Sequence, residues 1–138
     1  MTRFGSLLVC LLLLVGLLAT PGCGSSRQLQ SVALNPAAAD AQNFPSGQVP
    51  FTAIGTFNKP PSPVQLTSQD VTWCVGTSNG MCAGNIATGA SVDGKGVAQC
   101  RSRFSGTVTI LAGKGMPPAN PDGGVTLKVF GTAQLTCP

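Results

Sequence analysis

The sequence predicts an all-β domain built as an antiparallel β-sandwich and preceded by a signal peptide. Two observations lead to this fold class. Apolar residues after residue 28 alternate with a period of two, which is the pattern of strands that bury one face. The chain also contains 18 Gly and 11 Pro among its 138 residues, so turns are frequent and long helices are not expected. Short alternating strands between frequent turns are typical of a sandwich.

The first 22 residues have the features of an export signal. Arg3 is followed by an uncharged run over residues 4–19, which is shorter than the roughly 20 residues that a membrane-spanning helix needs. We therefore expect residues 1–22 to be a secretory signal peptide that is removed. A plain signal peptidase site is the alternative, but Pro21 lies awkwardly between the small residues Thr20 and Gly22.

The segment around Cys23 resembles the lipobox of bacterial lipoproteins. It reads ATPGCGSS over residues 19–26, with Thr20 where that family usually has Leu. The resemblance implies acylation of Cys23, a flexible tether over residues 23–28, and anchoring in the bacterial cell envelope, at the outer membrane or cell surface. Without acylation the exported chain would be periplasmic or secreted.

The first two strands follow this tether. Residues 29–35 form the first, which ends before Pro36. Residues 48–57 form the second, which contains Pro50. Because proline lacks the N–H donor, we expect pairing near it only at a sheet edge or a bulge. The proline-rich residues 58–63 cannot continue a sheet and are expected to form an exposed connection.

A third strand places Val71, Trp73 and Val75 on one face. Trp73 is expected to anchor the core there, and an exposed tryptophan platform for sugars is the alternative. Residues 77–94 are irregular and rich in Gly, Asn and Ser, and residues 92–97 are expected to form a tight hairpin turn.

Two further strands complete the domain. Residues 106–113 alternate, a Pro/Gly loop covers residues 116–124, and a long final strand covers residues 125–137. The predicted core consists of inward-facing residues from the four strands that follow the first: Phe51, Phe57, Trp73, Val108, Ile110, Leu127 and Val129.

The composition excludes several classes of function. The chain has no His, and its four acidic residues are all Asp, so histidine catalysis, histidine metal ligation and paired-glutamate hydrolysis lack their residues. We expect no enzyme activity, no cofactor and no metal. The formal net charge of +4 is too dispersed for nucleic-acid binding.

Only Arg101 and Arg103 lie close together. As alternate residues of an extended segment they are a candidate site for an anionic partner, and a solvated pair at a strand end is the alternative.

Four cysteines remain after Cys10 in the leader and Cys23 are set aside. An even number in an exported domain predicts two disulfides, for which three pairings are open. A zinc site is the weaker alternative because the sequence contains no CxxC motif. These cysteines are Cys74, Cys82, Cys100 and Cys137.

The order of segments resembles the bacterial immunoglobulin-like domain, group 2. The segments are QSVALNPAAA, VPFTAIGTF, VQLTSQDVTW, VDGKGVAQC, GTVTILAG and VTLKVFG. The resemblance implies one immunoglobulin-like sandwich of about seven strands over residues 29–138, displayed outside the cytoplasm. That family provides no catalytic residues to carry over, and its members serve as structural or adhesive modules. The four cysteines are additions to its basic pattern.

In an immunoglobulin-like topology, the strand that bears Cys100 ends where the final strand ends. This favours a Cys100–Cys137 disulfide, and Cys74 with Cys82 then close a short loop after the Trp73 strand. The expected function is that of a noncatalytic, membrane-tethered lipoprotein of the cell envelope with a structural or adhesive role. The alternative is a small binding module for an envelope glycan or a surface protein that uses the loop at residues 77–90.

Overall fold

The computed structural model describes residues 26–83, 89–116 and 124–138. Strands dominate this part of the chain, as the sequence predicted, and two short 3-10 helices lie between the second and third of them. None of the described helices is long and apolar enough to cross a membrane. In chain order the elements are β1 (Leu29–Asn35), β2 (Ala38–Asp40), η1 (Ala41–Asn43), η2 (Pro45–Gly47), β3 (Gln48–Pro50), β4 (Thr52–Phe57), β5 (Val64–Gln65), β6 (Thr72–Gly76), β7 (Ala90–Val92), β8 (Val97–Cys100), β9 (Gly106–Met116) and β10 (Thr126–Cys137).

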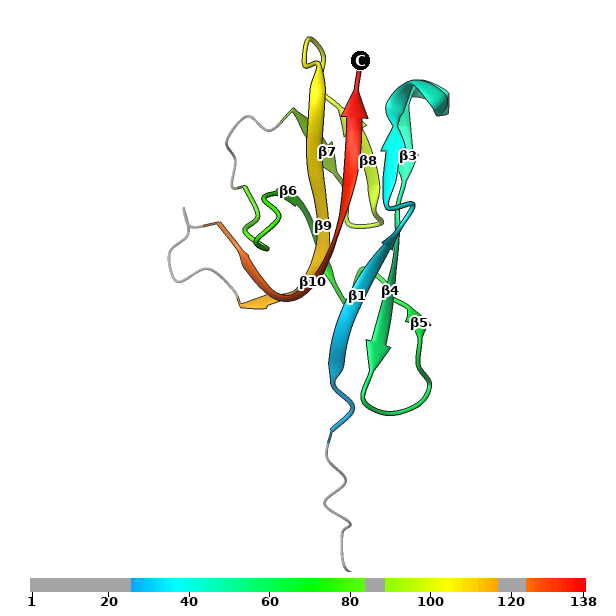
Figure 1. Ribbon diagram of the computed structural model, residues 1–138, viewed down its shortest axis with the longest axis vertical. Coiled ribbons are helices and arrows are strands. Elements are labelled where there is room, and N and C mark those ends of the chain that lie inside the picture. The colour runs from blue at the N-terminus through cyan, green and yellow to red at the C-terminus, as the bar shows by residue number, and fades with distance from the viewer. Residues whose placement is uncertain (1–25, 84–88, 117–123) are drawn as a thin grey trace, which may run out of the picture.

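The strands form two layers (Figure 1). In one layer β4 pairs with β1 and β5, and β3 pairs with β8, which in turn pairs with β7. Because only Phe51 separates β3 from β4, these two small sheets are halves of one layer. The other layer has the order β2-β10-β9-β6, in which β2 runs parallel to β10 and the remaining pairs are antiparallel.

This strand order is that of an immunoglobulin-like sandwich. When β3 and β4 are counted as one strand, β1, β3/β4, β8 and β7 lie in the order A-B-E-D, and β6, β9 and β10 lie in the order C-F-G. The described part of the chain therefore has seven principal strands, as predicted, with β2 and β5 as short additions.

The strand predicted over residues 48–57 is divided at Pro50. Upstream of it β3 pairs with β8 at the end of its sheet, and downstream β4 pairs with β1. The backbone N–H of Phe51 donates to the carbonyl oxygen of Gly96 at 2.9 Å rather than to a strand partner in either half-sheet. The proline thus marks the point at which the strand changes partners, which agrees with the prediction of an edge or bulge.

The main core lies between the two layers. Phe51 and Ile110 are buried in it, as predicted, and Phe57, Trp73, Val108 and Val129 are partly buried against it. Trp73 therefore belongs to the core rather than to an exposed platform. The other large apolar residues buried in the core are Val32, Leu34, Val49, Leu66, Val71, Val75 and Leu135.

Leu127 does not join the main core. A β-bulge between Leu127 and Val129 shifts the register of β10 against β9, so these two residues face different sides although they are two apart. Leu127 instead packs on the outer face with Leu111, Cys82 and the partly buried Phe130. The prediction that both Leu127 and Val129 face the core is therefore wrong for Leu127, because the extra residue Lys128 inverts the alternation.

The turn between β7 and β8 is the predicted hairpin. The Asp93 side-chain oxygen accepts hydrogen bonds from the backbone N–H groups of Lys95 and Val97, both at 2.8 Å. Gly96 has φ +84°, and a Cβ there would lie 2.5 Å from the Phe51 carbonyl oxygen and 2.7 Å from Cζ2 of Trp73. Only glycine fits this position without displacing backbone or core.

We therefore expect Gly96→Ala to lower the free energy of unfolding by about 1–3 kcal/mol, through strain at a positive φ and collision with Phe51. Gly94→Ala in the same turn is the matched control, because no described residue beyond its chain neighbours has an atom within 4 Å of the place that a Cβ would occupy there. Its effect should stay within about 0.5 kcal/mol. Urea unfolding followed by circular dichroism measures both, and equal effects would contradict the role assigned to Gly96.

Candidate functional site

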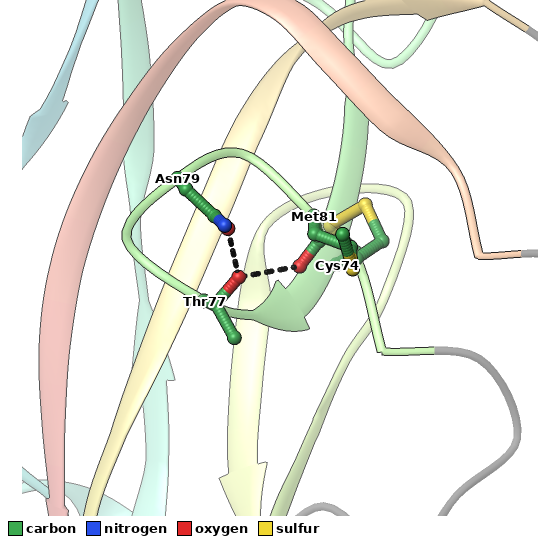
Figure 2. Close-up of a disulfide and its surroundings, with 5 residues drawn as sticks. Cys74, Thr77, Asn79 and Met81 are labelled. Carbon is green, nitrogen blue, oxygen red and sulfur yellow. Dashed lines mark hydrogen bonds between the residues drawn. A yellow bond between two sulfur atoms is a disulfide. The ribbon is translucent and has the colours of Figure 1, made fainter.

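The loop that follows β6 is closed by the Cys74–Cys82 disulfide, with 5.6 Å between the two Cα atoms (Figure 2). Beyond the turn, the N–H of Ala83 donates to the Val75 carbonyl at 2.8 Å, so the returning chain lies along β6. The N–H of Cys82 donates to the Val125 carbonyl at 2.9 Å. The loop is therefore attached to β6 on one side and to the segment entering β10 on the other.

Inside this loop, hydrogen bonds from Thr77 fix the turn. Its hydroxyl donates to the side-chain oxygen of Asn79 and faces the Met81 carbonyl at 3.4 Å (Figure 2). Its backbone N–H donates to the same carbonyl at 2.9 Å. Gly80 packs against the Phe130 ring, since a Cβ at this position would lie 2.4 Å from Cε1 of Phe130. The loop is thus part of the outer apolar cluster.

Met81 is the most exposed large apolar residue in the described part of the chain, with 51% of its surface accessible against 37% for Ile54. It borders a hollow of about 480 Å³ that is open to solvent. Phe104, Thr107 and Thr109 also line this hollow. Its described lining carries hydroxyl groups and apolar surface without an ionisable side chain, which suits binding by shape and hydrogen bonding.

The segment with Arg101 and Arg103 directly follows the end of β8 and is a turn, not the extended segment that the candidate anionic site assumed. Arg103 has φ +70°, so the chain reverses there and the argument that alternate residues share one face does not apply. Both side chains are exposed. Ser102 and the two arginines are weaker turn formers than Gly or Pro, so the sequence does not reveal this turn.

The turn nevertheless lies beside the hollow next to the disulfide loop. The N–H of Arg101 donates to the Gly89 carbonyl at 2.9 Å. A Cβ at Gly89 would lie 2.2 Å from Cε1 of Phe104, so the Phe104 ring covers that glycine. Both Gly89 and Phe104 line the hollow. The two elements that the sequence marked for partner binding, the 77–90 loop and the arginine turn, therefore adjoin one surface. Residues 84–88 of that loop lie outside the described residues.

The second disulfide joins Cys100 to Cys137, with 5.7 Å between the Cα atoms. It links the end of β8 to the end of β10, just before the arginine turn. Both pairings are those expected from an immunoglobulin-like topology. Two disulfides fit a protein of an oxidising compartment outside the cytoplasm. No group of three or more potential metal-ligating side chains (His, Cys, Asp or Glu) occurs among the described residues.

The end of the domain where β1 begins carries a residue that the sequence analysis assigned to the flexible tether. Arg27 lies 3.6 Å above the centre of the Phe57 ring, and its guanidinium donates to the carbonyl oxygens of Lys59 and Pro61. The Gln28 N–H donates to the side-chain oxygen of Asn58 at 2.8 Å. These two residues belong to the folded domain, whereas Cys23 lies outside the described residues.

No protein-family model matches the chain, and no curated protein matches it. The resemblance to group 2 bacterial immunoglobulin-like domains therefore stays a prediction from the sequence.

The two disulfides close loops of different length, because their paired cysteines are 8 and 37 positions apart in the sequence. The loss of chain entropy in the unfolded state predicts contributions of about 2.5 kcal/mol for the short loop and about 4 kcal/mol for the long one. We expect the double change Cys100→Ser with Cys137→Ser to destabilise more than Cys74→Ser with Cys82→Ser, as measured by urea unfolding. Nonreducing peptide mapping checks the pairing itself. A peptide linking Cys74 to Cys100 would contradict the structure.

Proposed function

We propose that the chain is a noncatalytic lipoprotein of the bacterial cell envelope, tethered to a membrane through an acylated Cys23 and with a structural or adhesive role. The observation that carries this proposal is the Gly-Cys-Gly-Ser-Ser stretch directly after an apolar leader of signal-peptide length. Each buried CH2 of an acyl chain contributes about 0.8 kcal/mol, so two or more chains anchor a small domain stably.

The arrangement of the domain agrees with a tether at this position. β1 begins six residues after Cys23, so little chain separates the anchor from the fold. The C-terminus lies at the opposite end of the sandwich (Figure 1). The arginine turn adjoins that end through the Cys100–Cys137 disulfide, where it would be turned away from the membrane.

Acylation is tested by expressing the full chain and its Cys23→Ser variant in a bacterial host. The unchanged chain should fractionate with membranes, and its intact mass should include diacylglycerol on Cys23. The Cys23→Ser chain should leave the membrane fraction. Cys10→Ser is the matched control, since that cysteine lies inside the leader and its loss should change neither result. An unmodified N-terminus on the unchanged chain would refute the proposal.

A second candidate function is that of a binding module for an envelope glycan or a surface protein. The contact of the arginine turn with Gly89, beside the exposed Met81, favours it. Such a surface combines a hollow with apolar and hydroxyl groups and a neighbouring cationic turn, which would select an acidic glycan.

A glycan array probed with the mature protein tests this alternative. For any glycan that binds, Met81→Ser should weaken binding, whereas Ile54→Ser should not, because Ile54 is the other exposed large apolar residue of the described chain and lies on β4, away from the hollow. Arg101→Gln should weaken an acidic glycan by about tenfold or more, since a charged hydrogen bond contributes about 1.5–3 kcal/mol. Equal effects of Met81→Ser and Ile54→Ser would exclude this surface.

A further inference from the structure

The end of the sandwich that faces the tether carries a hollow of about 210 Å³ with charged groups at its rim. Arg27 and Lys114 supply two cations, and Asp70 supplies one anion. Leu29 and Phe57 form apolar parts of the lining. Lys59, in the connection between β4 and β5, is a further cation at this end. Figure 1 shows the start of β1 and this connection at the end opposite the C-terminus.

Arg27 is held in place at this hollow. Its guanidinium stacks on Phe57, while its N–H groups donate to two carbonyl oxygens of the connection that follows β4. A cation above an aromatic ring is attracted by the negative face of the ring. Neither this contact nor the hydrogen bonds to the two carbonyls neutralises the positive charge of the guanidinium. Arg27 therefore presents a fixed charge rather than one that moves with the tether.

Asp70 does not cancel the two cations of the hollow. Its carboxylate accepts hydrogen bonds from the Thr67 N–H at 2.9 Å and from the Thr67 hydroxyl at 2.7 Å. These bonds, first that of the backbone and then that of the hydroxyl, hold the pKa of Asp70 below its ordinary value, with smaller contributions from Lys114 and Arg27. With one anion against Arg27 and Lys114, the hollow keeps a positive charge.

The length of the tether brings this hollow to the membrane. Arg27 is the fourth residue after Cys23, and an extended chain spans at most about 3.3–3.6 Å per residue, so the two Cα atoms lie within about 14 Å. The headgroup layer on each side of a bilayer is roughly 5–7 Å thick. Charges interact over a screening length of about 8–10 Å at physiological salt. An acylated Cys23 thus places Arg27 within electrostatic reach of lipid phosphates.

We propose that the tether-facing end of the sandwich docks onto an anionic phospholipid surface through Arg27 and Lys114, with phosphate headgroups as the recognised chemistry. This inference rests on the proposed acylation of Cys23, which supplies the high local concentration that two cations alone do not provide. Docking at this end turns the opposite end, with the arginine turn, toward the outside. A cation near an anionic membrane contributes about 1 kcal/mol, so the orientation is set by weak contacts made effective by the anchor.

The experiment uses the mature protein purified from a bacterial host that expresses the full chain, and measures how fast its single lysines react with an amine-specific reagent. The protein is reconstituted into vesicles of phosphatidylcholine alone and into vesicles that also contain phosphatidylglycerol. Lys114 should react at least about fivefold more slowly on the anionic vesicles, which corresponds to one cation contact. Lys95 is the internal reference, because it is exposed in the turn between β7 and β8 and should react equally on both.

Variants of Arg27 separate charge from packing. Arg27→Gln should reduce the protection of Lys114 on anionic vesicles by about fivefold, whereas Arg27→Lys, which keeps the charge, should retain most of it. Lys95→Gln makes the same change of charge elsewhere and should leave the protection of Lys114 intact. If Arg27→Gln impairs folding, the unchanged protein still decides the question. Raising the salt to about 1 M shortens the screening length to about 3 Å and should abolish the protection.

The outcomes distinguish the two proposals. Retention on both kinds of vesicle with equal reactivity of Lys114 overturns the docking and leaves the acylation in place. Protein that stays in solution with both kinds of vesicle refutes the acylation, and with it the docking that depends on the anchor. Protection of Lys114 that persists at high salt or in Arg27→Gln also overturns the docking, because it does not arise from these charges.

Discussion

The packing of Phe51 between β3 and β4 is the constraint on which the sandwich depends. In the described part of the chain, one layer consists of two half-sheets that share no strand pairing, so the chain must pass from one to the other without opening the core. Phe51 does this by burying its ring between the layers and donating its N–H to the Gly96 carbonyl. The close approach of Gly96 to Trp73 then closes the same region from the β7–β8 turn. Loss of these contacts would separate the half-sheet in which β4 pairs with β1 from the half-sheet in which β3 pairs with β8.

Apart from β1, with seven residues, and β6, with five, the outermost strands of the sheets are short, which limits unwanted pairing with other chains. β2, β7 and β5 are outermost strands of their sheets and have three, three and two residues. The returning chain at Ala83 covers part of the outer edge of β6. Short or covered edges present few unpaired backbone groups to another strand. These edges therefore offer few sites for aggregation by strand pairing.

The sequence contained enough to predict the strands with regular alternation but not the features that depend on contacts distant along the chain. β1 occupies its predicted residues 29–35, and Pro50 signalled the change of partners. The bulge at Lys128 has no sequence signature, so Leu127 was assigned to the wrong cluster. Arg27 has the sequence context of a linker because its contacts with Phe57 and Pro61 come from residues about thirty positions away. Tertiary packing determines which contacts such residues make, and the local sequence pattern carries no information about those contacts.

The two disulfides give the candidate binding surface its rigidity. Cys74–Cys82 holds the loop with Met81 on β6, and Cys100–Cys137 holds the base of the arginine turn on the last strand. Each covalent link ties an irregular segment to the sandwich at its root, so little ordering remains to be done when a partner binds. The opposite end achieves a similar effect without a covalent bond, because Arg27 is fixed by an aromatic ring and two carbonyls.

The rigid frame therefore separates two surfaces of different chemistry: a cationic one near the tether, and one of hydroxyl and apolar groups beside the arginine turn. The proposed anchor at Cys23 would leave the other end available to a partner only if the domain did not tumble on its tether. So short a tether before a fixed Arg27 would restrict that tumbling.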